Sequence, residues 1–241
     1  MKGLFKNCEE IEKIEFTKCY RQTFTDISQM FFGCKKLKEV NISKLRTNYV
    51  NNMSSMFYNC CSLQKVNLSS LNTQNVKNMN YMFEKCESLT EIDLSNFNTS
   101  NVTHMTSMFK ECKSLQKLDL SNFNTNKVND MFAMFLKCSK LEELNLSNFN
   151  TSNVINMSQM FKECSSLKKL EIPSFDIGKI TDMAGMFSHC YLLTEITFSN
   201  FNNNQLIIMD KMFYECNELK KINCSDELKE VIRKKFTELN I

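Results

Sequence analysis

Residues 108–123 read MFKECKSLQKLDLSNF, and the same arrangement of Met, Phe, Cys and Leu returns 26 residues earlier and 26 residues later. Nine cysteines keep this spacing along the chain: Cys8, Cys34, Cys60, Cys86, Cys112, Cys138, Cys164, Cys190 and Cys216. A fixed period of roughly 20–50 residues is typical of solenoids, in which each repeat contacts only its neighbours. The sequence therefore predicts one continuous stack of repeats instead of separate globular domains.

Each repeat begins with a strand pattern. Leu115, Leu118 and Leu120 follow the order L-x-x-L-x-L, and the last two leucines are two residues apart. Side chains at this spacing lie on the same face of a strand. We therefore expect a short strand in every repeat, with its leucines facing inward.

A second spacing follows the strand. Val102, Met105, Met108, Phe109 and Cys112 recur at intervals of three and four. This spacing predicts one apolar stripe along a helix. Asn and Thr side chains at 98–101 carry oxygens that can cap the start of that helix.

Together these patterns predict an α/β leucine-rich-repeat solenoid. It contains about nine 26-residue strand–turn–helix repeats over residues 1–224, with a parallel sheet on one face and helices on the other. Residues 225–241 are expected to form a capping helix, with Ser225 as its N-cap, acids in its first turn and bases near its end.

The chain begins inside a repeat. Met1 aligns with Met53 and with the equivalent Met of later repeats, and no capping element precedes it. Terminal repeats normally need a polar outer face. We therefore expect a leader or further repeats upstream in the native protein.

The cysteine column occupies an apolar position of the stripe. Cysteine behaves as a small buried hydrophobic residue, so buried thiols are the first interpretation. Disulfides between neighbouring repeats and a metal site are the alternatives. No C-x-x-C pair is present, and we predict neither a metal site nor a cofactor.

Composition argues against several classes of function. The net charge is +3 and acids and bases are mixed along the chain, so we predict no nucleic-acid partner. No stretch reaches the roughly 18 consecutive apolar residues of a membrane span. No nucleophile–base pair or phosphate-binding glycine loop indicates an enzyme. The prediction is a monomeric, non-enzymatic protein-binding module without membrane insertion.

The outward positions of the strands carry the candidate binding face. One column alternates completely between Lys and Glu: Lys13, Glu39, Lys65, Glu91, Lys117, Glu143, Lys169, Glu195 and Lys221. The residues singled out as a candidate binding face are Lys65, Glu91, Asp93, Lys117, Asp119, Glu143, Asn145 and Lys169. Opposite charges on neighbouring strands support pairing. Two interpretations stay open: a solvated ladder of ion pairs, or a broad polar recognition face.

A few apolar residues stand at outward positions. These candidates for an anchor patch are Phe32, Tyr58, Leu136, Tyr214, Phe132, Tyr191, Leu192, Ile207 and Ile208.

The repeat MSxMFxxCxSLxxLxLSNFNTSNV, which residues 105–128 follow except at Thr106, Asn126 and Lys127, resembles the BspA-like leucine-rich-repeat family of bacterial and protist surface proteins. The resemblance covers residues 1 to about 224 and implies adhesion or binding of a host or extracellular-matrix protein at the cell surface. An intracellular scaffold with an intracellular partner is the alternative, and a cytoplasmic location would follow if Met1 is the true start.

Overall fold

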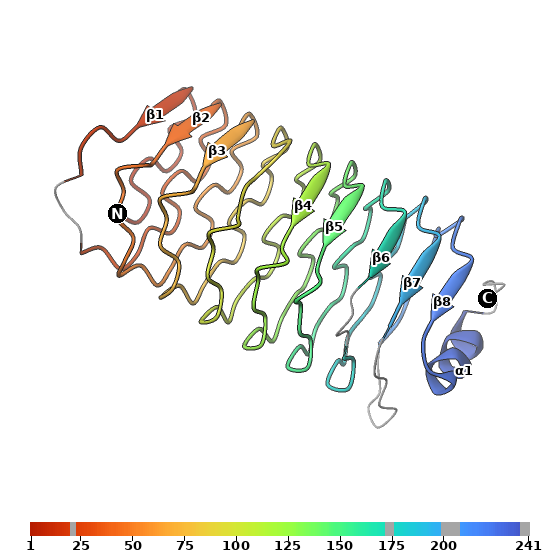
Figure 1. Cartoon of the computed structure of the whole chain (residues 1–241). Coiled ribbons are helices and arrows are strands. Elements are labelled where there is room, and N and C mark those ends of the chain that lie inside the picture. The colour runs from red at the N-terminus through yellow and green to blue at the C-terminus, as the bar shows by residue number, and fades with distance from the viewer. Residues whose placement is uncertain (20–22, 172–175, 199–207, 237–241) are drawn as a thin grey trace.

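Each 26-residue repeat forms one rung, and the rungs stack side by side along one axis, with the strands in a row and a helix at the C-terminal end (Figure 1). The computed structural model describes residues 1–19, 23–171, 176–198 and 208–236. The architecture is a leucine-rich-repeat solenoid with parallel strands, as the 26-residue period predicts.

Each strand is three residues long and pairs with the strand of the next rung. The strands are β1 (Lys13–Glu15), β2 (Glu39–Asn41), β3 (Lys65–Asn67), β4 (Lys117–Asp119), β5 (Glu143–Asn145), β6 (Lys169–Glu171), β7 (Glu195–Thr197) and β8 (Lys221–Asn223). Every observed pairing is parallel and joins residues 26 apart, for example Lys117 opposite Glu143. Because one rung is one period, the sequence spacing sets the strand register directly.

The number of strands differs slightly from the nine expected. Over the described residues eight strands form, and hydrogen bonds join them in three groups, β1–β2–β3, β4–β5 and β6–β7–β8. Residues 91–93 form no strand. The Glu91 side chain still forms an ion pair with Lys65 at 3.0 Å, so Glu91 lies on the outer face like the equivalent residues of the other rungs.

In the part of the chain that the structure describes, the predicted helices on the opposite side of each repeat are not formed. The Met-Phe segment of every rung is a run of tight turns with two left-handed residues, such as Ser107 with φ 54° and Glu111 with φ 61°. A right-handed helix cannot include residues with positive φ. The sequence-based expectation of strand–turn–helix repeats was therefore wrong in its helical part.

Hydrogen bonding between rungs explains why turns replace the helix. The Phe109 N–H donates to the Met134 carbonyl of the next rung at 3.0 Å, whereas the Lys110 N–H closes a turn on the Ser107 carbonyl at 3.2 Å. In a helix, both amides would be bonded within their own segment. Stacked rungs of similar conformation offer partners on either side, and the turns still bury the apolar stripe.

The Asn and Thr side chains at 98–101 consequently cap no helix. Thr99, which is buried, accepts the Asn124 N–H at 2.7 Å and donates its hydroxyl to the Asn124 carbonyl at 3.0 Å. The Asn98 side chain accepts the Ser100 N–H at 3.0 Å. These residues join one rung to the next and shape the turn within a rung.

The core consists of columns of identical side chains. Phenylalanine rings one residue after the second Met of each rung stack in sequence; Phe109 lies 5.7 Å from Phe83 and 5.8 Å from Phe135, centroid to centroid. Beside them the cysteine thiols donate to phenylalanine carbonyls of the preceding rung, as Cys112 does to Phe83 at 3.2 Å.

The last rung is covered by α1 (Asp226–Lys235). Ser225 caps it by accepting the Leu228 N–H at 3.4 Å, and acids in the first turn and bases in the last turn match the helix dipole. Leu228 and Ile232 are buried. Residues 237–241 of the expected capping segment lie outside the described part of the chain. Within that part, no helix has the length and apolar character needed to cross a membrane.

The left-handed turns can be tested by substitutions at Gln159, whose φ is 58°. We expect Gln159→Gly to be more stable than Gln159→Ala by about 1 kcal/mol, because glycine adopts positive φ without the steric cost of a Cβ. A helix would give the opposite order by about 1 kcal/mol. Urea unfolding of both variants measures the difference. The equivalent residue of the next rung is Gly185, which shows that the position accommodates glycine.

Candidate functional site on the outer face of the sheet

The structure places the eight residues singled out from the sequence along two grooves on the outer face of the sheet. One groove, of about 610 Å³, is lined by Lys117, Asp119, Glu143, Asn145 and Lys169 together with the underlying strand residues. The other, of about 440 Å³, is lined by Lys65, Glu91 and Asp93. The alternation of inward and outward side chains along each strand brings these residues to one face.

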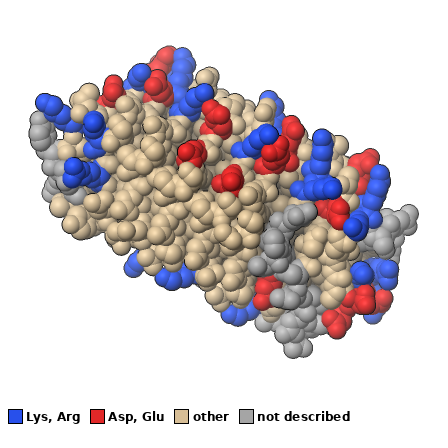
Figure 2. Space-filling view, viewed as in Figure 1, with Lys and Arg blue, Asp and Glu red and all other residues tan. Residues whose placement is uncertain are grey.

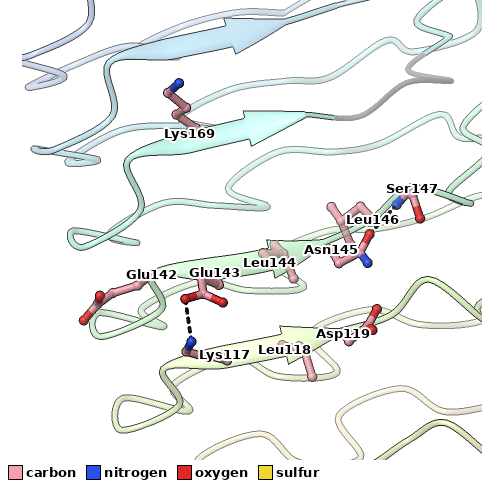
Figure 3. Close-up of a pocket in the computed structure, with 10 residues that line it drawn as sticks. All are labelled: Lys117, Leu118, Asp119, Glu142, Glu143, Leu144, Asn145, Leu146, Ser147 and Lys169. Carbon is pink, nitrogen blue, oxygen red and sulfur yellow. Dashed lines mark hydrogen bonds and ion pairs between the residues drawn. The ribbon is translucent and has the colours of Figure 1, made fainter.

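The larger groove crosses three neighbouring strands (Figure 3). Lys117 and Asp119 come from the two ends of β4, Glu143 and Asn145 from the two ends of β5, and Lys169 from β6. Leu118 and Leu144 lie between these polar ends. The groove therefore has a polar rim on both sides and a limited aliphatic area in its middle.

In the Lys–Glu column, ion pairs connect neighbouring rungs two at a time. Four pairs form, each from one Lys and one Glu 26 residues apart: Lys13–Glu39 at 3.0 Å, Lys65–Glu91 at 3.0 Å, Lys117–Glu143 at 2.6 Å and Lys221–Glu195 at 2.7 Å. The hydrogen bond with Glu143 raises the pKa of Lys117. Glu143 and Glu195, the acids one rung either side of Lys169, are thus already paired with other lysines.

Two aspartates are held in their charged form: Asp119 at the end of β4 and Asp93 at the equivalent position of the preceding rung. The Ser121 N–H donates to Asp119 at 2.9 Å, and this bond lowers the pKa of the carboxyl. The Ser95 N–H does the same for Asp93 at 2.9 Å. Hydrogen bonds to a carboxylate favour its ionised form. Each groove therefore has a fixed negative charge at one end and a Lys–Glu pair at the other.

Charge is not spread evenly over the surface. Figure 2 shows acidic and basic side chains interspersed along the part of the stack where the strands lie, beside a wide area that carries neither. Ser-Asn pairs follow β4 and β5 in the sequence. The outer face of the sheet thus combines both signs of charge with the two grooves.

The predicted apolar anchor residues do not form one patch. Leu136 is buried, Phe32 and Tyr58 are half-buried and stack on each other at 4.6 Å, and Ile207 lies outside the described residues. Tyr191, Leu192, Ile208 and Tyr214 are exposed near the C-terminal end. Phe132 is half-buried.

The sequence analysis missed a buried ion pair on the turn side of the stack. Glu84 is only 4% exposed, and Lys110 of the next rung reaches it at 3.0 Å. Burial by itself lowers the pKa of Lys110, but the hydrogen bond and charge of Glu84 raise it. The 26-residue spacing of Glu84 and Lys110 could have predicted that they lie side by side on neighbouring rungs. Nothing in the sequence shows that the pair is buried.

The cysteine column consists of thiols, in agreement with the first interpretation. Eight of its nine members are buried and Cys8 is half-buried. Burial raises the pKa of Cys138 to about 12, because the thiolate would lose its hydration. Over the described residues, no group of three or more His, Cys, Asp or Glu side chains is arranged to hold a metal ion.

Several solved structures are similar to the chain. A leucine-rich-repeat protein from Bacteroides ovatus ATCC 8483 aligns with a TM-score of 0.43 and 18% identity over 92% of this chain, which spans 62% of that protein. A leucine-rich cell surface protein from Faecalibacterium prausnitzii A2-165 aligns with a TM-score of 0.31 and 16% identity over 92% of this chain and 90% of that one. The Toll–Spätzle complex from Drosophila aligns with a TM-score of 0.34 and 16% identity over 99% of this chain and 37% of that chain.

A comparison with curated protein sequences finds no match. A family profile, in contrast, matches residues 1–118 and again residues 111–227, and its description is "Mycoplasma protein of unknown function, DUF285". The two matches follow the repeats from the first rung to the start of α1. The chain therefore belongs to the DUF285 family, which is consistent with its resemblance to the BspA-like leucine-rich repeats.

Proposed function

We propose that the chain is a non-enzymatic binding module that holds a partner protein on the outer face of its sheet, at the cell surface, in adhesion or binding of a host protein. The observation that carries the proposal is the coincidence of the two grooves with all eight residues of the candidate face. An extended face with both signs of charge suits selective contact with a protein surface, because charge complementarity favours one partner over others.

The exposed ion pairs are compatible with this role. The side chains of Lys117 and Glu143 are 69% and 65% exposed, and ion pairs this open to water contribute little to stability. A partner can therefore replace them with its own charges at small cost. The hydrogen bonds that fix Asp93 and Asp119 provide two anchor points whose orientation is already set.

The second candidate function is an intracellular scaffold, which many free thiols would favour because cysteines stay reduced inside cells. The structure weakens this argument, because eight column thiols are buried and burial raises their pKa. A neutral buried thiol resists oxidation whatever the compartment. Labelling of intact cells with a membrane-impermeant reagent separates the two locations: labelling of the chain supports the surface role, and protection until lysis supports the scaffold.

Binding is tested with a triple variant of the larger groove, Lys117→Gln, Asp119→Asn and Lys169→Gln. The unmodified chain is first screened for binding to immobilised collagen, laminin and fibronectin. We expect the triple variant to bind the matrix protein identified in this screen at least tenfold more weakly, because the charged rim of the groove is removed. Surface plasmon resonance measures the change.

The matched control changes the same number of charges on the turn side of the stack: Lys137→Gln, Lys162→Gln and Glu163→Gln. This variant should bind within about twofold of the unmodified chain. Equal loss in both variants, or no binding of the unmodified chain to any of the matrix proteins, would contradict a matrix-binding outer face.

A further inference from the structure

A separate recess lies at the C-terminal end of the stack, between the last strand and the helix that covers it. Its volume is about 180 Å³. It is lined by Lys220, Lys221, Ile222, Lys229, Ile232 and Arg233. Ile222 comes from β8 and Ile232 from α1, and both are buried. The recess is thus an apolar hollow between two elements, with cationic side chains around it.

The cations come from both sides of the recess. Lys220 and Lys221 belong to the last rung, whereas Lys229 and Arg233 are four residues apart on α1 and so lie on the same side of that helix. All four charged residues that line the recess are basic. The charged part of the lining is therefore positive, although the net charge of the whole chain is only +3.

Each cation has an acidic partner that lies beside the recess and not among its lining residues. The pairs are Lys220–Glu218 at 3.3 Å, Lys221–Glu195 at 2.7 Å, Lys229–Asp226 at 3.3 Å and Arg233–Glu230 at 3.6 Å. The basic side chains are 41–75% exposed. Exposed pairs of this kind are weak, and both lysine and arginine can donate to a further carboxylate.

We propose that this recess binds an acidic segment of a partner protein, with a carboxylate between the cations and a neighbouring aliphatic side chain over Ile222 and Ile232. The apolar floor favours a segment that carries Leu or Ile beside Asp or Glu. The arginine fork of Arg233 favours a carboxylate, which it can bind with two hydrogen bonds. This site is separate from the outer face of the sheet and does not depend on the role proposed for that face.

A peptide fits the recess better than an extended anion. Glu218, Glu195, Asp226 and Glu230 surround the four cations, so a flat anionic bilayer or a nucleic-acid backbone would meet both signs of charge at once. A single carboxylate on a short side chain enters a volume of about 180 Å³ whose charged lining residues are all basic. The small hollow therefore selects for a narrow group in preference to a broad charged surface.

The test uses the full chain and a fluorescein-labelled peptide of sequence Glu-Glu-Leu-Glu-Leu, followed by fluorescence anisotropy. We expect saturable binding that weakens as salt is raised, and at least a tenfold weaker affinity for the double variant Lys229→Gln and Arg233→Gln. Lys220→Gln, on the rung side of the recess, should weaken binding severalfold without touching α1. The peptide Gln-Gln-Leu-Gln-Leu should bind at least tenfold more weakly than the acidic one.

The matched control is Lys44→Gln with Lys77→Gln, two exposed lysines on other rungs, which lowers the net charge equally and should leave affinity within twofold. Equal loss in this control would show that the peptide senses net charge alone, and would overturn the site. The site would also be overturned if the acidic peptide did not bind, or if the two peptides bound equally. The same holds if phosphatidylserine vesicles or oligouridine bound more tightly than the peptide and the Lys229 and Arg233 changes abolished that binding.

Discussion

Replacing Phe109 with alanine is expected to lower the free energy of unfolding by about 3–5 kcal/mol, the usual cost of removing a buried phenylalanine. Phe109 is fully buried and its ring stacks between Phe83 and Phe135 at interplanar angles of 8° and 1°. The substitution leaves a gap that rungs on both sides cannot fill, because their own positions are fixed by the hydrogen bonds between rungs. Urea unfolding followed by circular dichroism measures the loss.

Phe132, in the Met-Phe segment of the next rung, provides the comparison. It is half-buried and takes no part in the phenylalanine column. Phe132→Ala should therefore cost clearly less, about 1 kcal/mol or below. Similar losses in the two variants would mean that the stacked column is not the main source of stability in the central rungs.

Alkaline pH is expected to unfold the chain near pH 10, through the cysteine column. Burial raises the pKa of Cys34 to about 11 and those of Cys138 and Cys216 to about 12, whereas an unfolded cysteine titrates near about 8.5. Below about pH 8.5 the thiol is neutral in both states, so its contribution to stability is fully present. Above that pH only the unfolded chain ionises, and stability falls until the folded pKa is reached.

The size of the effect follows from the number of thiols. Each contributes a loss of up to about 1.4 kcal/mol per pH unit, and eight column cysteines are buried. Their sum exceeds the roughly 5–15 kcal/mol that stabilises a typical domain within about one to two pH units. Urea unfolding at a series of pH values between 7 and 10 measures the slope.

Lysines and tyrosines also titrate in this range, so a variant has to isolate the thiols. Cys112→Ala with Cys138→Ala should reduce the slope above pH 9 by about 1.4 kcal/mol per pH unit for each thiol removed. An unchanged slope would refute the assignment. As a check on burial, only Cys8, Cys19, Cys61 and Cys224, which are half-buried, should react with a thiol reagent in the native chain at pH 7.5.

The candidate site could be predicted from the sequence only as far as the faces of the strands. Alternation along a strand places Lys117 and Asp119 outward and Leu118 inward, whatever the neighbouring rungs do. Which lysine takes which glutamate does not follow from alternation, since Glu143 has a lysine on the rung before and on the rung after. The structure pairs it with Lys117. The recess beside α1 was equally hidden, because its cations come from segments with no common period.

The sequence by itself determined the 26-residue rung, the parallel register and the identity of the core columns, since a strict repeat stacks like residues on like. Only the tertiary structure decided the conformation of the Met-Phe segment. An apolar spacing of three and four is satisfied by a helix and equally by successive tight turns, and the choice depends on where the amides find partners. In the rung that contains Phe109, half of the backbone amides of residues 107–112 donate to carbonyls of the next rung. These hydrogen bonds need a neighbouring rung, so the sequence of a single repeat does not reveal them.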